Sequence, residues 1–129
     1  MSDAPRRPEN VYQRYHAHVY FDAGTVEQAR ALCQRVAADY PAVAMGRVHE
    51  RLVGPHPRWS CQLAFGNEQF DAVIARLERE RNGLTVFVHG LTGDDYADHT
   101  AHAMWLGDAA ELDLRMFAPG PASERPHPQ

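Results

Sequence analysis

The sequence predicts an α+β fold with the ferredoxin-like βαββαβ order: an antiparallel sheet, two helices on one face, and a C-terminal extension. Two segments carry apolar residues at the 3.6-residue period of a helix, and four others have the alternation typical of strands. These segments follow one another as strand, helix, strand, strand, helix, strand. At 129 residues and 44% hydrophobic composition, the chain is long enough for one domain with one core.

Each element has its own signal. A first strand is expected at 15–21, where apolar residues alternate with polar ones. A helix follows from Thr25, with Gln28 in the capping-box position, and ends at Pro41 because proline cannot continue it. The remaining expected elements are strands at 44–51 and 58–65, a helix from Asn67 with Asn82-Gly83 as its C-cap, a strand at 84–89, and short strands near 103–106 and 112–117.

The folded domain is expected to cover residues 11–117. Residues 1–10 and 118–129 are rich in proline and charge and lack periodicity, which predicts two flexible tails. Cys33 and Cys61 are isolated from each other in sequence and fall at apolar positions, so we interpret them as core thiols.

Composition excludes several classes of partner. The net charge of −4 argues against a nucleic-acid ligand. An RNA-binding sheet would share the topology, but His16, His18, Ser60 and Gln62 stand where it would carry aromatic residues. No apolar run is long enough for a membrane span, and the N-terminal residues do not resemble a signal peptide. We therefore expect a cytoplasmic protein with no membrane partner.

Histidine is the compositional anomaly, with eight residues in the chain. If apolar alternates face the helices, four histidines from three strands share the opposite, open face of the sheet: His16, His18, His49 and His89. The first and fourth strands are neighbours in this fold, so His89 is expected near His16. Two histidines on one strand and a third on its neighbour could bind Zn or non-haem Fe. The His16–His18 pair could instead be two solvated surface side chains.

Three further histidines allow more than one interpretation. His99 and His102 are three residues apart, so a helical turn there would place both on one side, where they could cap the open face. His56 stands between two prolines in a rigid turn. That position suits a fixed acid or base, and it suits an exposed loop histidine equally well.

Four segments together resemble a known family. They are YHAHVYF, GPHP, VFVHGLTGDD, and DHTAHAMWLG followed by LDL, in this order along the chain. They resemble the DOPA 4,5-dioxygenase family, in its small fungal and bacterial form, and the resemblance covers about residues 12–117. One departure is Gly90, because members of the family commonly have proline after the histidine at the position of His89.

The resemblance implies an extradiol dioxygenase that opens the ring of DOPA or a related catechol with Fe(II) and O2. Zn(II) is expected to substitute for iron in the isolated protein. The expected metal ligands are His16, His18 and His89. Two points stay open: one histidine of the pair could orient substrate instead, and a carboxylate from Glu50, Asp98 or Glu111 could join the set.

The same resemblance suggests roles for other residues. His56 and His99 are the expected proton-transfer residues, with His102 in reserve. Arg47 is expected to bind a substrate carboxylate, and Tyr20 and His49 complete the expected substrate contacts. An open sheet face is only half a pocket, which predicts a homodimer. The alternative function is a non-catalytic domain that binds a metal or small ligand on the same scaffold.

Overall fold

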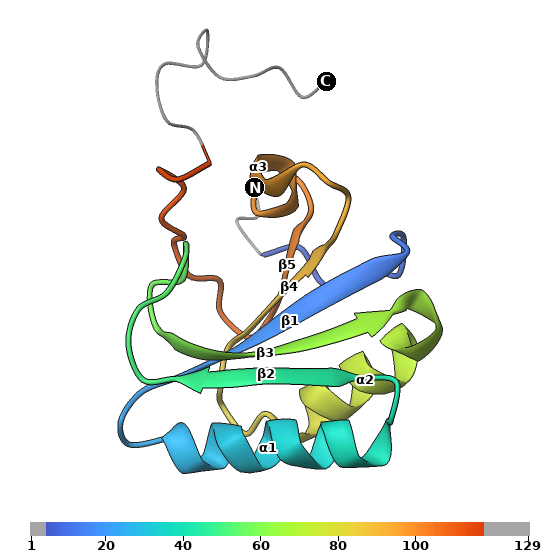
Figure 1. Cartoon of the computed structure of the whole chain (residues 1–129), viewed down its shortest axis with the longest axis vertical. Helices are drawn as coiled ribbons and strands as arrows, with labels where there is room; N and C mark the ends of the chain where they lie inside the picture. The colour runs from blue at the N-terminus through green and yellow to red at the C-terminus, as the bar shows by residue number, and fades with distance from the viewer. Residues whose placement is uncertain (1–4, 118–129) are drawn as a thin grey trace, which may run out of the picture.

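The computed structural model describes residues 5–117, and the remaining parts of both predicted tails, 1–4 and 118–129, lie outside the described residues. The chain forms a single sheet with helices in the connections (Figure 1). The elements in chain order are β1 (Arg14–Phe21), α1 (Val26–Asp39), β2 (Ala44–His49), β3 (Trp59–Gly66), α2 (Asn67–Glu80), β4 (Val86–Gly90), α3 (Asp95–Asp98) and β5 (Ala103–Leu106).

The sheet has the order β2-β3-β1-β4-β5, and every neighbouring pair is antiparallel. Helices α1 and α2 cover one face, whereas α3 and residues 107–117 lie toward the other (Figure 1). The first four strands therefore confirm the predicted ferredoxin-like fold. The predicted strand at 103–106 is also confirmed, as β5 on the sheet edge.

The strand predicted at 112–117 is wrong. Residues 107–117 form bends, a turn and irregular chain that cross the open face. One hydrogen bond, from the backbone N–H of Asp113 to the carbonyl of Pro55 (2.8 Å), ties this segment to the loop before β3. The alternation in this stretch thus serves local packing, with Leu112 against the aromatic residues of the sheet.

The core lies between the sheet and the two long helices. Alternate residues of β1 face it, and Ala17 and Val19 have no solvent exposure. Burying these apolar side chains is the main favourable contribution to the free energy of folding. The larger core residues from the helices are Leu32, Val36, Phe70, Val73 and Leu77. Both cysteines are buried here as free thiols, which agrees with their predicted role.

Helix α1 starts at the predicted place, but the predicted capping box is wrong. The Thr25 hydroxyl does not cap the helix, because it donates to Asp22 Oδ1 (3.0 Å) and accepts from the Asp22 N–H (3.0 Å). The Gln28 amide donates to the carbonyls of Arg81 (3.2 Å) and Asn82 (3.1 Å). Gln28 therefore connects the start of α1 to the turn after α2.

Strand β2 contains an irregularity that the sequence pattern did not predict. The pairing with β3 shifts register between Met45 and Val48, and both of these side chains pack against the core. His49 pairs with Ser60, on the open face. Arg47 lies inside the shift and is exposed. Strict alternation along β2 therefore fails at the position proposed to bind substrate.

The described part of the N-terminal segment runs beside β5. The carbonyl of Arg6 accepts a hydrogen bond from the backbone N–H of Trp105 (2.8 Å), and Arg7 forms an ion pair with Glu78 (3.0 Å). In residues 5–117, no helix has both the length and the apolar character needed to cross a lipid bilayer.

Candidate metal centre

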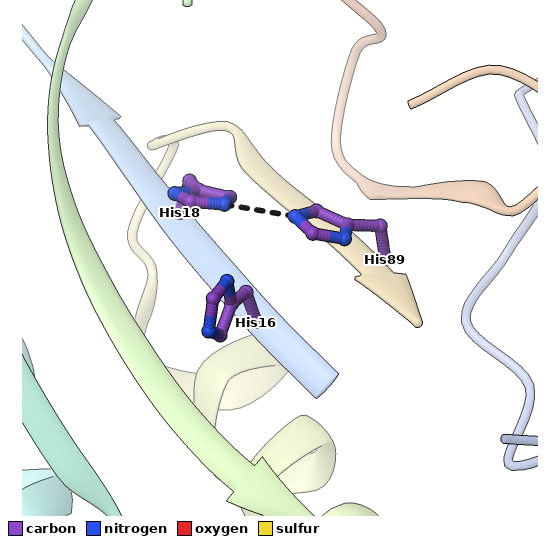
Figure 2. Close-up of side chains that lie close together, drawn as sticks. All are labelled: His16, His18 and His89. Atoms are coloured by element: carbon purple, nitrogen blue, oxygen red, sulfur yellow. Dashed lines mark hydrogen bonds between the residues drawn. The ribbon is translucent and has the colours of Figure 1, made fainter. Parts of the chain in front are cut away.

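Three histidines converge on the open face of the sheet. His16 and His18 project from β1, and His89 projects from β4, where it pairs directly with His16. Figure 2 shows the three rings turned toward one another. Each offers one ring nitrogen, and these three atoms lie within 4.8 Å of one another. Strand alternation accounts for the arrangement, because residues two apart on β1 leave the same face.

The distances suit a single ion. The Nε2 atoms of His18 and His89 are 3.1 Å apart. Two imidazoles bound to one ion at about 2.1 Å, at angles between octahedral and tetrahedral, would have their nitrogens about 3.0–3.4 Å apart. The Nδ1 of His89 lies 2.9 Å from the carbonyl oxygen of Gly90. Since a carbonyl only accepts, Nδ1 carries the proton and Nε2 keeps its lone pair, as metal ligation requires.

Burial keeps this cluster neutral. His18 and His89 are only 5% and 2% exposed. Desolvation lowers the pKa of His18 well below its usual range and that of His89 to about 4. Half-buried His16 has its pKa lowered by the same cause. Neutral imidazole is the form that binds metal, so no proton has to be displaced near neutral pH. The interpretation of the pair as two solvated side chains is wrong for His18.

Aromatic residues line one side of the cluster. Phe87 pairs with Trp105 across β4 and β5, and the two rings stack with centroids 4.7 Å apart. The His18 ring stacks on Phe87 at 5.6 Å. Leu112, from the segment that crosses the open face, packs against this aromatic cluster, which also includes Tyr20. These contacts limit the access of water to that side of the histidines.

His56 belongs to the same site, although it lies 33 residues before His89 on a loop. It is 8% exposed, and its ring centroid is 4.2 Å from that of His18. Its Nδ1 is 2.8 Å from the hydroxyl of buried Tyr20. Desolvation lowers the pKa of His56 to about 4 and raises the pKa of Tyr20. The alternative of an exposed loop histidine is therefore wrong.

His99 reaches the cluster from the segment after β4. Its ring centroid is 4.4 Å from that of His89, and its other side stacks on Phe117 at 4.5 Å. The Nδ1 of His99 is 2.7 Å from the carbonyl oxygen of Asp95, so Nδ1 donates, and Nε2 has no hydrogen-bond partner among residues 5–117. This side chain is half-buried.

His102 does not accompany His99, because α3 ends at Asp98 and the predicted helical turn does not reach either histidine. The Nδ1 of His102 lies 2.9 Å from Asp98 Oδ1, and its ring packs against Tyr12. The buried Asp98 carboxylate also accepts from the N–H (2.9 Å) and hydroxyl (2.6 Å) of Thr92. Asp98 thus holds the turn that carries His99.

Carboxylates take no part in the cluster among the described residues. Within residues 5–117 the candidate ligand group consists of three histidines alone. Asp98 is occupied by Thr92 and His102. Glu50 lies 3.7 Å from Arg30 on α1, and Glu111 is exposed. The geometry therefore supports an all-histidine ligand set.

Sequence reasoning missed two aromatic residues of the site. Trp105 was not selected, although its place opposite Phe87 follows from pairing of the predicted strand at 103–106 with its neighbour. For Phe117 the alternation at 112–117 predicts a strand, whereas Phe117 reaches His99 from irregular chain. Of the proposed substrate contacts, His49 lies opposite Ser60, whereas Tyr20 is buried against His56.

Together these features define a ferredoxin-like domain with three neutral histidines on the open face of its sheet, flanked by two more. Residues 15–116 match the model of the Dopa 4,5-dioxygenase family. The chain belongs to that family. Its fold and histidine cluster are thus the features of a dioxygenase-like protein.

Two fungal proteins are similar to this chain in sequence. An uncharacterized 21.2 kDa protein of Botryotinia fuckeliana is 33% identical over 113 residues, which are 79% of this chain and 62% of that protein. The DOPA 4,5-dioxygenase of Amanita muscaria is 29% identical over 114 residues, 82% of this chain and 50% of the enzyme. The chain therefore spans between half and two thirds of these relatives.

A solved structure shares the fold. The crystal structure of a candidate dioxygenase from Nostoc punctiforme has a TM-score of 0.71 and 38% sequence identity. The match covers 84% of this chain and 93% of the Nostoc chain. Unlike the fungal relatives, the Nostoc protein is matched over nearly its whole length.

Proposed function

We propose that this protein is an extradiol dioxygenase that uses Fe(II) and O2 to open the ring of DOPA or a related catechol. The observation that carries the proposal is the convergence of three neutral histidines, with two further histidines in ring contact with them. The family assignment and the name of the Amanita relative support the choice of reaction.

His16, His18 and His89 would hold the ion. The donor set fits, because three imidazoles on one side leave other coordination positions for substrate and O2. A ferrous ion held there would supply catechol binding and the activation of O2. The residues themselves contribute orientation: the Gly90 carbonyl fixes the His89 ring, and Phe87 supports the ring of His18.

We propose His56 and His99 as the proton-transfer residues. Each contacts one proposed ligand ring, His56 beside His18 and His99 beside His89. A neutral imidazole can accept a proton from a catechol hydroxyl and return it later in the reaction. Tyr20, which the sequence suggested as a substrate contact, would act through His56 by holding its Nδ1 in a hydrogen bond.

Substrate selection would use residues of β2, at the edge of the open face. Arg47 is exposed in the irregular part of β2, and within residues 5–117 it has no ion-pair partner. Its guanidinium could receive a substrate carboxylate bidentately. His49, on the same strand and opposite Ser60, would supply a polar contact on the open face.

The proposal includes a homodimer. The segment 107–117 covers the aromatic side of the cluster, but His16 remains only half-buried. A second subunit that covered the side of the cluster at His16 would complete the exclusion of water. Light scattering across a wide concentration range tests this, and a constant monomer mass with full activity would rule it out.

The reaction can be tested directly. The protein is loaded with Fe(II) without oxygen, mixed with L-DOPA, and exposed to air in an oxygen electrode cell. We expect consumption of one O2 per substrate and a yellow, semialdehyde-derived absorbance, with neither in the Zn(II)-loaded control. Fe(II) retention without O2 uptake on any of several catechols would instead support the non-catalytic metal-binding alternative.

A further inference from the structure

A concavity lies at the far end of β1 from His16. It is a cavity of about 270 Å³ between the end of β1, the start of β3 and the loop that joins β2 to β3. Phe21, Leu52 and Trp59 give it apolar walls. Phe21 belongs to the helix-side core, with Trp59 packed against it, so these walls lie on the opposite side of the sheet from the histidine cluster.

Two opposite charges line the same cavity. Arg58 is exposed and, within residues 5–117, forms no hydrogen bond or ion pair. Asp22 is held by two hydrogen bonds to its Oδ1, from the Gly24 N–H (2.9 Å) and the Thr25 hydroxyl (3.0 Å). Its second oxygen has no hydrogen-bond partner among the described residues. The two charged groups are not paired with each other, so both are available to a ligand.

This combination selects a class of ligand. A simple anion would be attracted by Arg58 but repelled by Asp22, and a simple cation would meet the reverse. A zwitterion satisfies both groups, and the apolar walls require a hydrophobic portion. Aromatic residues such as Trp59 also favour a flat partner that can stack or pack edge to face.

We propose that this cavity binds a free α-amino acid with an apolar or aromatic side chain. Its carboxylate contacts Arg58, its ammonium contacts Asp22, and its side chain lies against Phe21 and Trp59. The proposal is independent of the function proposed for the histidine cluster, because the two sites share no residue.

A tryptophan side chain lies at each of the two sites and can report on binding there. It has two tryptophans, Trp59 in the cavity wall and Trp105 stacked on Phe87 beside the histidine cluster. In an NMR titration of the full-length, ¹⁵N-labelled chain with L-phenylalanine, the indole N–H signal of Trp59 should shift and saturate. The signal of Trp105 reports separately on binding of L-phenylalanine beside the histidine cluster, because L-phenylalanine shares the amino acid group of DOPA. We expect a dissociation constant in the millimolar range or below.

Truncated probes and matched variants test the charge pattern. 3-Phenylpropanoate lacks only the ammonium and phenethylamine lacks only the carboxylate, so each should bind at least about tenfold more weakly than L-phenylalanine. Arg58→Gln and Asp22→Asn should each weaken L-phenylalanine by a similar factor. Asparagine keeps the oxygen that serves Gly24 and Thr25, so the turn is preserved. Arg51→Gln, an exposed neighbour outside the cavity, is the control and should change little.

Five results would overturn the proposal. The first four are a shift of Trp105 alone, no saturable shift of Trp59, equal binding of 3-phenylpropanoate and L-phenylalanine, and equal binding by the parent and Arg58→Gln. A shift of Trp59 that depends on protein concentration without any ligand would also overturn it, because a second copy of the chain would then be the occupant.

Discussion

The two faces of β1 differ in what limits substitution. On the helix side, Ala17 and Val19 are fully buried among apolar groups, and their contribution is to the stability of the fold. On the open side, His18 is 5% exposed, almost as buried, yet its neighbours are three other imidazoles and Phe87. Burial alone therefore does not distinguish structure from function; the chemistry of the neighbours does. Burying several imidazoles together costs stability, which points to selection for a role other than packing.

The largest expected contrast is between adjacent residues. His18→Ala should lower Fe(II) affinity at least about 100-fold, because it removes a proposed ligand. Val19→Ala should leave metal affinity unchanged and lower the free energy of unfolding by about 1–3 kcal/mol, because it opens a cavity in the core. Metal stoichiometry and melting temperature, measured on both variants, check this. Parent-like Fe(II) binding and turnover in His18→Ala would show that the site is misplaced.

The next effect concerns pH. In the metal-free protein the pKa of His56 and that of His89 are both lowered to about 4, from about 6.5 in the unfolded chain. Between these values the unfolded state binds more protons than the folded state. The contribution of these two histidines to the free energy of unfolding is therefore fully present above pH 6.5 and is lost as the pH falls toward 4. Each histidine should cost about 2 kcal/mol at pH 5, which predicts a fall in melting temperature on the order of 10 °C.

Two variants sharpen the pH experiment. His56→Gln removes one titrating group and should flatten the profile between pH 4.5 and 6.5. Val19→Ala should lower stability equally across this range and keep the shape of the profile. A parent profile that is flat above pH 5 would mean that the buried histidines are not neutralised by burial.

Much of the open face could be predicted because strand alternation is a local rule. His16, His18 and His89 follow from the period of two and the strand order. His56 could not be resolved, because its burial depends on Tyr20, 36 residues earlier in the chain. The capping box failed for a similar reason: Gln28 finds better acceptors in the carbonyls of Arg81 and Asn82.

Contacts made by irregular chain were beyond prediction. Phe117 lies in a segment whose alternation predicts a strand, and nothing in the sequence connects it with His99. The register shift in β2 had one weak signal, the glycine at position 46, since glycine inside a strand often marks a bulge. That shift matters because it includes Arg47.

A smaller effect is expected at Gly90, the last residue of β4. A Cβ added there would lie 2.5 Å from Tyr12 Cγ, so either the ring or the end of β4 has to move. Gly90→Ala should cost about 1–3 kcal/mol of stability. It should also weaken metal binding, because the Gly90 carbonyl orients His89. Tyr12→Ala in the same chain should recover part of both losses, and additive effects in this double-mutant cycle would contradict the steric explanation.

The smallest expected effect is at Arg47, where alternation along β2 breaks down. Its exposed guanidinium would form a solvent-screened ion pair with a substrate carboxylate, and such pairs contribute about 1 kcal/mol or less. Arg47→Gln should therefore raise the KM for L-DOPA up to about fivefold, with kcat and the melting temperature unchanged. A catechol without a carboxylate should show no change, and Arg51→Gln, another exposed arginine after β2, should affect neither substrate. If Arg47→Gln raised the KM of both catechols equally, the arginine would act through the shape of the β2 irregularity instead of its charge. The open face would then depend on strand geometry at its rim, as the helix-side face depends on its packing.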